Sequence, residues 1–287
     1  MAKQLPALAD MRGGEISAFR TRCKELVDTS TKGLVSRAAL EQVLVESAPS
    51  VSAAWLATAT ELELIAQGAT MFEDMTLDVS RFSGASRGAL GAAAWGEFQR
   101  QLTDFGDFLQ GSRARRALRL SAKQRMSLAC VVGYALSATH GFTLQMDHNG
   151  QVFDTASHER AGEKFFELSE VLPDQAGDEG VASISFPYPG KDDVLAATAR
   201  FGLDAAPKLF LAGSAAVTDI NVLNTAVNEA KAALVAFRSR HRLQRVHLFV
   251  KAPSVFAMAL GHRLNGVGVV QLYDWVEIGY QQTGELR

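Results

Sequence analysis

The spacing of hydrophobic residues changes once along the chain, from a helical period to alternating strand and helix. Apolar side chains recur every three to four residues over 16–27, again from Leu40 to Leu44, and again after Pro49. That spacing places them on one face of a helix. The sequence therefore predicts a small helical segment over residues 1–70, with a third helix that extends through Ile65.

After this segment, short aliphatic runs alternate with amphipathic stretches, which is typical of a parallel α/β sheet. A turn signature, Asp147-His-Asn-Gly150, predicts a hairpin that closes onto Val152-Phe153. In chain order the predicted elements are strand 75–82, helix 89–105, strand 116–121, helix 125–137, strand 141–146, a connector with a helix near Phe165 and Phe166, strand 182–186 and a helix from Asp192, then strand 208–212, helix 222–238, strand 246–250, helix 254–264 and strand 268–273.

Two stretches of the α/β region repeat each other. Arg116-Ala-Leu-Arg-Leu-Ser-Ala-Lys-Gln-Arg125 leads to Gly133-Tyr-Ala-Leu136, and Arg245-Val-His-Leu-Phe-Val-Lys-Ala-Pro-Ser254 leads to Gly261-His-Arg-Leu264. Each copy predicts a strand, a short basic loop and a helix with its glycine and leucine at matching places. Ligands of such sheets bind at the carboxyl ends of strands, facing helix N-termini. The duplication therefore predicts one site between the two copies.

The loops at the predicted strand ends supply two kinds of ligand contact. Small residues let a ligand approach the backbone and offer amides and hydroxyls, while basic residues neutralise phosphate. The small residues are Ser83, Gly84, Ser86, Gly213 and Ser214, and the basic ones are Lys123, Arg125 and Lys251. Because any strand-to-helix loop is built from such residues, the repetition carries more weight than any single position.

The composition narrows the classes of function. The chain has 287 residues, 47% hydrophobic, with no apolar run long enough for a membrane span and no apolar signal-peptide core near Met1. Its two cysteines, Cys23 and Cys130, are too few for a disulfide framework, so a reducing cytoplasm is expected. The formal net charge of −2 argues against a general nucleic-acid or membrane surface. An anionic partner would thus be held locally, and we expect no direct DNA binding and no cofactor.

The second copy of the repeat carries a family resemblance. The stretch 246–265, followed by Val270-Gln-Leu-Tyr-Asp274, resembles the closing signature of SAVED domains. The stretch from Gly133 through Thr139-His-Gly-Phe142 to the predicted turn is similar to the middle of that family. The resemblance covers residues 70–287 and leaves the first seventy residues unmatched.

The resemblance implies a fold and a function. SAVED domains are fused pairs of CARF-like, Rossmann-type units that sense cyclic oligonucleotides in bacterial anti-phage signalling, usually to regulate an attached effector. After the helical segment 1–70 that the hydrophobic spacing predicts, the resemblance implies a SAVED-like domain 71–287, with a first half 71–156, a connector 157–204 and a second half 205–287. The expected ligand is a cyclic tri- or tetra-adenylate. Because residues 1–70 show no effector pattern, ligand-driven assembly into an oligomer or filament is expected to activate a separate effector protein.

The resemblance also implies which residues line the pocket. These residues are Ser83, Gly84, Ser86, Arg87, Lys123, Gln124, Arg125, Gly213, Ser214, Lys251, Ala252, Pro253, Ser254, Tyr273 and Trp275. The indole ring of Trp275 either packs in the core at the end of a strand or stacks on a base of the ligand.

A serine hydrolase is the main alternative from a different class. Gly84-Ala-Ser86-Arg-Gly88 matches the G-x-S-x-G nucleophile elbow, and Asp147 and His148 follow in the order of a triad. However, only helices are predicted before this elbow, and the second copy lacks it. Adjacent residues on a turn also orient each other poorly for a triad.

The sequence also bears on two further chemistries, a ring nuclease and a zinc site. A ring nuclease that cuts its own ligand needs only a hydroxyl or an amine against the scissile phosphate, and Ser83 or Lys251 could supply it. The sequence leaves this alternative open. A zinc site is not expected, because His140, His148 and His158 are irregularly spaced and have no cysteine nearby.

Overall fold

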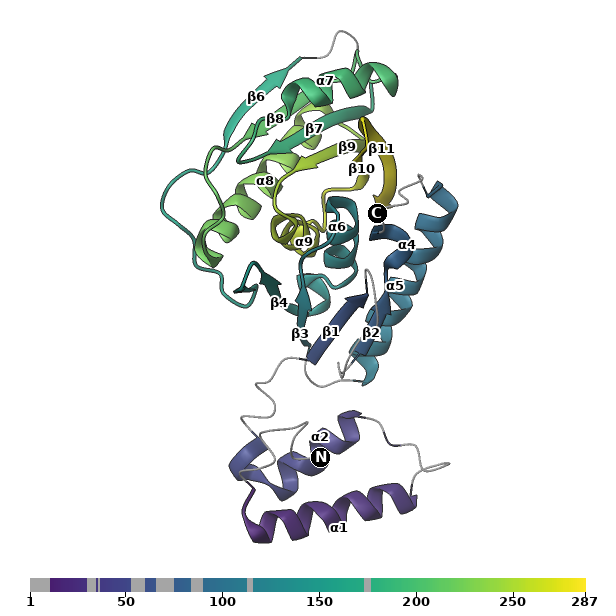
Figure 1. Ribbon diagram of the computed structural model, residues 1–287, viewed down its shortest axis with the longest axis vertical. Coiled ribbons are helices and arrows are strands. Elements are labelled where there is room, and N and C mark those ends of the chain that lie inside the picture. The colour runs from purple at the N-terminus through teal and green to yellow at the C-terminus, as the bar shows by residue number, and fades with distance from the viewer. Residues whose placement is uncertain are drawn as a thin grey trace.

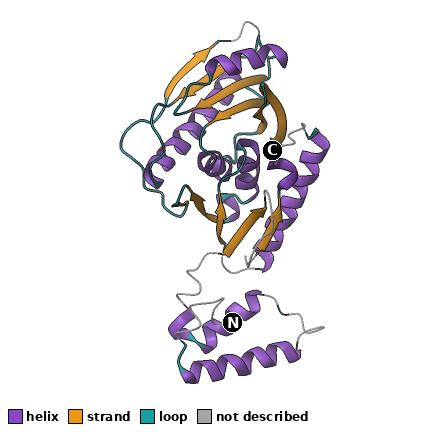
Figure 2. Ribbon diagram, in the orientation of Figure 1, coloured by secondary structure: helices purple, strands orange, loops and turns teal. Residues whose placement is uncertain are grey.

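The computed structural model describes residues 11–29, 35, 37–52, 60–65, 75–83, 90–112, 116–172 and 177–287. The helices α1 (Gly13–Thr29) and α2 (Arg37–Ser47) lie apart from the rest of the protein (Figure 1). They confirm the first two predicted helices, and a small apolar cluster that includes Leu44 and Phe19 packs them together. The remaining described chain forms two sheets with helices packed between and around them (Figure 2).

The first sheet has the strand order β2-β1-β3-β4-β5. All neighbours are parallel except β5, which returns antiparallel to β4. The turn between β4 and β5 uses positive φ at Asn149 (51°) and Gly150 (81°), as a two-residue hairpin favours, so the predicted hairpin is confirmed. The elements are β1 (Thr60–Ile65), β2 (Met75–Asp78), α4 (Ser80–Ser83), α5 (Ala92–Ser112), β3 (Ala117–Ser121), α6 (Met126–Ala135), η3 (Ala138–His140), β4 (Thr143–His148) and β5 (Gln151–Asp154).

The second sheet has the strand order β11-β10-β9-β7-β8-β6. Its four inner strands are parallel, and antiparallel strands form both edges. The elements are β6 (Glu167–Val171), β7 (Glu179–Ser185), α7 (Lys191–Arg200), β8 (Lys208–Ala212), α8 (Ile220–His241), β9 (Arg245–Lys251), α9 (Ser254–Arg263), β10 (Val269–Val276) and β11 (Gly279–Leu286).

The two sheets are copies of one unit. The order β2-β1-β3-β4 of the first sheet corresponds to β8-β7-β9-β10 of the second. Counterparts start 128 residues apart: α5 at Ala92 and α8 at Ile220, β3 at Ala117 and β9 at Arg245, α6 at Met126 and α9 at Ser254, β5 at Gln151 and β11 at Gly279. The predicted fold class, two tandem Rossmann-type units after a helical segment, is confirmed.

The helices α6 and α9 join the two units by packing backbone against backbone. A Cβ atom added to Gly133 would lie 2.1 Å from the Met258 carbonyl oxygen. A Cβ atom added to Gly261 would lie 2.1 Å from the Cys130 carbonyl oxygen. These contacts are reciprocal, since each glycine meets the carbonyl three residues before its counterpart. The two units are therefore related by an approximate two-fold axis at this crossing, and one apolar cluster runs through both.

A buried histidine forms hydrogen bonds across the same junction between α6 and α9. His262 is 1% exposed, and its Nδ1 donates to the Leu136 carbonyl at the end of α6. Since a carbonyl only accepts, Nδ1 carries the proton and Nε2 accepts from the Thr155 hydroxyl at 3.3 Å. Burial lowers the pKa of His262 to about 4. The imidazole is therefore neutral at pH 7 and links both units.

The prediction of a helix over residues 60–65 was wrong. The helix predicted to extend through Ile65 is replaced there by β1, which pairs with β2 and β3. Leu62 and Leu64 are both buried, so apolar residues point inward with a period of two. The alternating Thr-Glu-Leu-Glu-Leu-Ile pattern is that of a strand, whereas the predicted helix rested on the spacing of its apolar residues at a helical period.

Two other predicted elements also differ. The strand predicted over 75–82 ends at Asp78, and α4 follows it. The helix predicted near Phe165 and Phe166 is absent from this described stretch. Instead, the backbone amides of both residues donate to the Glu229 carboxylate on α8, which fixes an extended chain.

Strand pairing divides the chain at other positions than those expected from the sequence. β1 precedes residue 71, yet it pairs inside the first sheet. β7 lies within the expected connector 157–204, yet it is an inner strand of the second sheet. The described sheets run from Thr60 to Asp154 and from Glu167 to Leu286.

The glycine crossing gives a stability prediction. Gly133→Ala places a methyl group against a backbone carbonyl that cannot move alone, so we expect a loss of about 1–3 kcal/mol or more in the free energy of unfolding. Gly96→Ala, in the open on α5 with nothing within 4 Å of the added Cβ, is the control and should gain about 0.5–1 kcal/mol. Urea titrations measure both. Equal effects of the two substitutions would refute the crossing as described.

The buried histidine gives a pH prediction. The folded pKa of His262, about 4, lies below the ordinary 6.5, so the unfolded chain binds more protons between these values. Stability should therefore fall as the pH drops through this window, by about 2 kcal/mol at pH 5 from this group. His262→Asn keeps a donor near the carbonyl but does not titrate. The difference between urea unfolding at pH 7 and pH 5 should be smaller in this variant, and an unchanged difference would contradict the assignment.

Candidate functional site

The loops after three strands of the second sheet meet at one edge. The Gly213 amide, just after β8, donates to the Ser185 carbonyl at the end of β7 at 2.9 Å. The Phe186 amide, just after β7, donates to the Lys251 carbonyl at the end of β9 at 3.0 Å. Residues predicted from different loops, Gly213 and Lys251, are thus brought to the same carboxyl edge of the sheet.

The first unit reaches this edge through the start of α6. That helix has Arg125 at its N-cap position, without a capping side-chain hydrogen bond. The Ser127 amide instead donates to Asp274 Oδ1, at the carboxyl end of β10, at 2.9 Å. Asp274 is 5% exposed, and a carboxylate at a helix N-terminus is stabilised by the unpaired amides and the dipole. A side chain of the second unit therefore caps the helix that follows the loop 122–125 of the first.

Lys251 is the most clearly positioned cation of this edge. Its ammonium donates to the Pro189 carbonyl and to Asp193 Oδ2, both at 3.0 Å. Gly190 makes room for the aliphatic stem, because an added Cβ would lie 3.2 Å from the Lys251 Cδ. The side chain remains 45% exposed, so a solvent-borne anion can reach it.

The equivalent loop of the first unit has a different character. Lys123 is exposed, and its charge adds to burial in lowering the pKa of His148 at the end of β4. Gln124 is 8% exposed, and its Oε1 has no hydrogen-bond partner among the described residues. Arg125 is partly buried at the start of α6. The two copies thus present Lys-Gln-Arg and Lys-Ala-Pro at matching places, so the two loops are chemically unlike.

The remaining predicted residues of the second unit differ in their exposure to solvent. An added Cβ on Gly213 would lie 2.9 Å from the Phe165 ring, so packing alone requires glycine there. Ser214 is exposed, whereas Ala252 and Pro253 are partly buried before α9. Ser254, the first residue of α9, is 8% exposed.

The two predicted aromatic residues differ in exposure. Tyr273 is 2% exposed and its ring stacks on Phe249, with ring centroids 4.2 Å apart, so this residue is part of the core. Trp275 is 47% exposed, and its Nε1 donates to the Glu277 carbonyl. The half-open indole favours the base-stacking role over the core role for Trp275.

Of the loop predicted over 83–87, only the first residue lies within the described part of the chain. Ser83 is the last residue of α4, and Gly84, Ser86 and Arg87 lie outside the described residues. The triad alternative can be examined at its other end. The Asp147 carboxylate pairs with the Arg119 guanidinium at 3.0 and 3.2 Å rather than with a histidine. That pairing leaves Asp147 poorly placed to orient an imidazole.

Three residues at this edge were not predicted. Ser127 and Asp274 form the cap between the units, and Asp193 pairs with Lys251. The sequence did place Asp193 in the first turn of a helix, where acidic residues are common. Its spacing from Lys251 carries no signal, because the two are neighbours only through the sheet.

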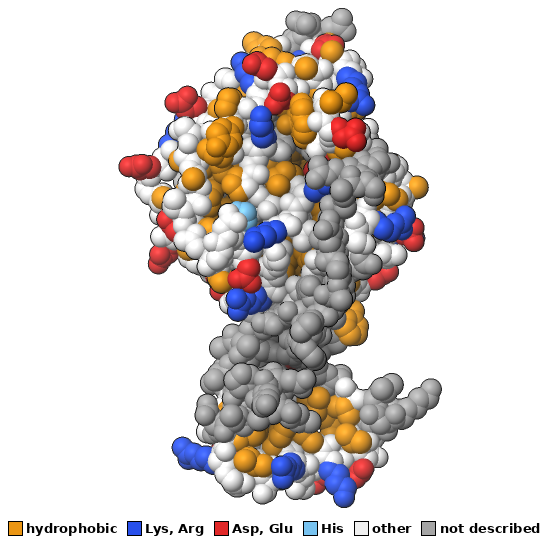
Figure 3. All heavy atoms as spheres, in the orientation of Figure 1, with side chains coloured by type: hydrophobic (Ala, Val, Ile, Leu, Met, Phe, Trp, Pro, Cys, Tyr) orange, Lys and Arg blue, Asp and Glu red, His pale blue; other side chains and the backbone are white. Residues whose placement is uncertain are grey.

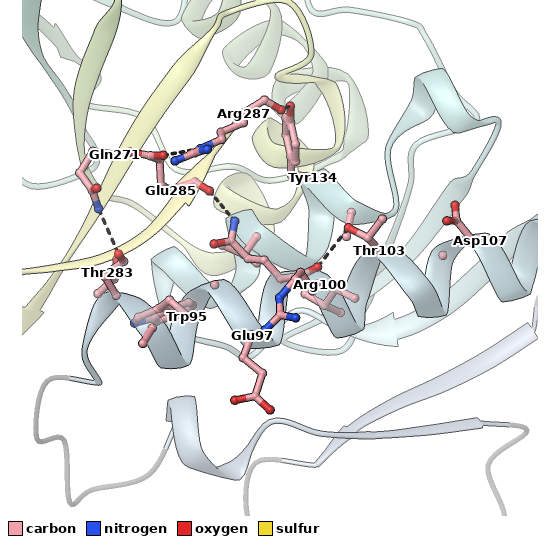
Figure 4. A pocket seen from close by; sticks show the side chains of 18 of the residues that line it. Trp95, Glu97, Arg100, Thr103, Asp107, Tyr134, Gln271, Thr283, Glu285 and Arg287 are labelled. Atoms are coloured by element: carbon pink, nitrogen blue, oxygen red, sulfur yellow. Dashed lines mark hydrogen bonds and ion pairs between the residues drawn. The ribbon is translucent and has the colours of Figure 1, made fainter.

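A cavity of about 870 Å³ lies elsewhere, between α5, α6 and β11 (Figure 4). The side chains that converge on it include Trp95 and Arg100 from α5, Tyr134 from α6 and Glu285 from β11. Its lining also includes Arg245, at the amino end of β9, and none of the predicted site residues. The cavity is thus toward the opposite ends of the strands, where α/β sheets rarely bind ligands.

The charges on the visible surface are mixed. Basic and acidic side chains are interspersed over the face shown in Figure 3, without a broad area of one sign. This agrees with a local anion site rather than an extended basic surface. Among the described residues, no helix is long and apolar enough to cross a bilayer.

The fold and its converging loops define a class: fused pairs of CARF-like, Rossmann-type units. Residues 101–286 match the SAVED family, described as the SMODS-associated and fused to various effectors sensor domain. The chain belongs to the SAVED family.

Relatives and solved structures extend the match. CD-NTase-associated protein 4 from Acinetobacter sp. (strain ATCC 27244 / 9458) is 36% identical over 273 residues, which is 95% of this chain and 58% of the relative. The protein of the same name from Moraxella osloensis is 36% identical over 94% of this chain and 57% of its own length. The chain therefore spans somewhat more than half the length of these relatives. A match over 273 residues includes most of residues 1–70, which the resemblance had left unmatched.

Solved structures of Cap4 receptors are also similar. The Acinetobacter baumannii Cap4 SAVED/CARF-domain containing receptor with the cyclic trinucleotide 2'3'3'-cAAA has a TM-score of 0.88 and 36% identity, over 96% of this chain and 62% of that one. The same receptor with 3'3'3'-cAAA has a TM-score of 0.89 and 35% identity, over the same shares of both chains. The Moraxella osloensis receptor has a TM-score of 0.82 and 34% identity, over 97% of this chain and 61% of that one.

Proposed function

We propose that this chain is a sensor that binds a cyclic oligonucleotide, with a cyclic triadenylate as the first candidate, and passes the signal to an effector in anti-phage defence. The carrying observation is the similarity over 96% of the chain to a receptor solved with 2'3'3'-cAAA and with 3'3'3'-cAAA. An identity of 36% accompanies the shared fold, so the likeness extends to sequence as well as architecture.

The chemistry of the carboxyl edge supports an anionic ring as ligand. Phosphodiesters carry one charge each, and charge-assisted bonds from ammonium and guanidinium groups are their usual partners. Lys123 and Arg125 from the first unit and Lys251 from the second are candidate donors at this edge. The half-exposed Trp275 offers a stacking surface for a base.

The difference between the two copies supports a ring without two-fold symmetry. A homodimeric site presents identical loops on both sides and suits an even ring. Here the matching positions hold Lys-Gln-Arg125 and Lys-Ala-Pro253. A ring of three nucleotides has no two-fold symmetry, so its two sides can contact unlike loops. A cyclic tetra-adenylate would instead place equivalent phosphates against unlike loops.

We propose binding without chemistry. The relatives with known structure are described as receptors, which supports this role. In a ring nuclease, Lys251 would act on a scissile phosphate, yet its ammonium already donates to a carboxylate and a carbonyl. An ammonium with these partners is suited to holding a phosphate by charge-assisted hydrogen bonds.

The output is proposed to be ligand-driven assembly that activates an effector. The helices α1 and α2 pack on each other through their own apolar cluster and leave Val27, Leu40 and Val45 more than a third exposed. Apolar side chains left exposed in this way are available for contact with a partner. We propose that head-to-tail stacking of liganded copies uses such surfaces, and that the effector is a separate protein.

The ligand test is a thermal-shift panel of cyclic di-, tri- and tetranucleotides, because a ligand of the folded state raises the melting temperature. We expect a cyclic triadenylate to give the largest shift. Lys251→Ala and Arg125→Ala should each weaken its binding by roughly ten-fold, as the loss of a charge-assisted bond requires. Lys24→Ala, an exposed lysine on α1, controls for net charge and should bind as the wild type does. No shift with any ligand would refute the sensor, and unchanged affinity in both site variants would move the site elsewhere.

The assembly test is light scattering with and without the cyclic triadenylate. We expect a monomer at tens of micromolar without ligand and larger species with it, since heterologous contacts build open assemblies. Lys251→Ala should need more ligand for the same change. A chain that binds the ligand tightly and stays monomeric would refute assembly and leave the sensor intact.

A further inference from the structure

We propose that Asp193 is a positioning residue of the ligand site, and that its ion pair with Lys251 is a latch that the ligand must open. This inference rests on the proposed function, because the competing anion is a phosphate of the cyclic oligonucleotide. In the free protein the carboxylate holds the Lys251 ammonium, and in the complex a phosphate takes its place.

The geometry ties the first turn of α7 to the loop after β9. Asp193 Oδ2 accepts from the Lys251 ammonium at 3.0 Å, and the Pro189 carbonyl, just before α7, accepts from the same group at 3.0 Å. An added Cβ on Gly190 would lie 3.3 Å from the Ser185 Cβ, so this turn is packed down on the end of β7. One ammonium thus fixes the start of α7 against the edge where the ligand is proposed to bind.

The exposure of the pair makes it replaceable. The side chains of Lys251 and Asp193 are 45% and 37% exposed. Ion pairs in such surroundings contribute about 0.2–1 kcal/mol, which a phosphate of a multiply charged ring can outcompete. The free energy needed to break this ion pair reduces the free energy of ligand binding by the same amount. Asp193 therefore weakens the affinity for the ligand without contacting it.

The far end of α7 connects the latch to a different surface. The Arg200 guanidinium, in the last turn, donates to the Tyr280 carbonyl at the start of β11 at 3.3 Å. The turn between β10 and β11 carries Ile278, which is 93% exposed. Release of the first turn of α7 would therefore loosen a helix whose other end contacts this hairpin. Breaking the Lys251–Asp193 ion pair would thus couple ligand binding, through α7, to an exposed apolar surface outside the site.

The chain offers a matched control one residue away. Asp192 is also in the first turn of α7 and has the same charge, but it is exposed and does not bond Lys251. Asp192→Asn and Asp193→Asn therefore remove the same charge from the same helix turn. Long-range attraction for an anionic ligand and the effect on the helix dipole are equal to first order, so the difference between the variants isolates the latch.

The experiment measures the affinity of 2'3'3'-cAAA and 3'3'3'-cAAA for both variants and the wild type by calorimetry. We expect Asp193→Asn to bind about two- to five-fold more tightly than Asp192→Asn, as the loss of an exposed ion pair predicts. Hydrogen exchange at the amides of 194–197 gives a second readout. These amides should exchange faster when ligand binds the wild type, and they should be equally fast in Asp193→Asn with and without ligand.

Each result decides between the two proposals. Equal or weaker binding by Asp193→Asn relative to Asp192→Asn, with the wild type binding normally, overturns the latch alone. Ligand-independent exchange over 194–197 in the wild type also overturns it. Failure of the wild type to bind either ring overturns the proposed function, and the latch with it.

Discussion

The close crossing of α6 and α9 is the contact on which the rest of the structure depends. Two glycines, Gly133 and Gly261, allow each helix to lie against the backbone of the other, so the two units share one core rather than meeting at a surface. Protein interiors tolerate little added volume, which makes such a backbone contact a fixed distance. The relative position of the two sheets, and of every loop at their edges, follows from this distance.

The α6–α9 contact also determines how the two units meet at the carboxyl ends of the strands, where the candidate site lies. Because α6 is held against α9, its N-terminus meets the end of β10, and Asp274 caps it across the two units. The start of α6, just after the loop 122–125, thereby meets the carboxyl end of β10, whose neighbour β9 ends in Lys251. A fold that only paired two Rossmann-type units would not require their loops to converge. The shared helix junction and the cross-unit cap make them do so.

Duplication explains both the regularity and the asymmetry of the protein. A spacing of 128 residues relates the starts of four pairs of elements, α5 and α8, β3 and β9, α6 and α9, and β5 and β11, because both copies must fold into the same unit. The loops are free of that requirement and have diverged, as Gln124 and Ala252 illustrate at matching places. α7 lies in the second unit between β7 and β8, and it supplies the carboxylate that holds Lys251. Two duplicated units in one chain can thus carry different side chains at matching loop positions.

The sequence by itself determined the repeat, most elements after residue 90 and the family, because strand and helix periods and the glycine-leucine spacing are local patterns. It misread β1, since a short strand such as Thr60–Ile65 shows only three alternations, and the burial that distinguishes it from a helix comes from pairing with β2 and β3. It proposed Lys251 and Gly213 from their place after strands. It could not propose Asp193, Ser127 or Asp274 as their partners. Those contacts join residues 58 and 147 positions apart along the chain, and only the packing of the sheets and the α6–α9 junction brings them within hydrogen-bond distance.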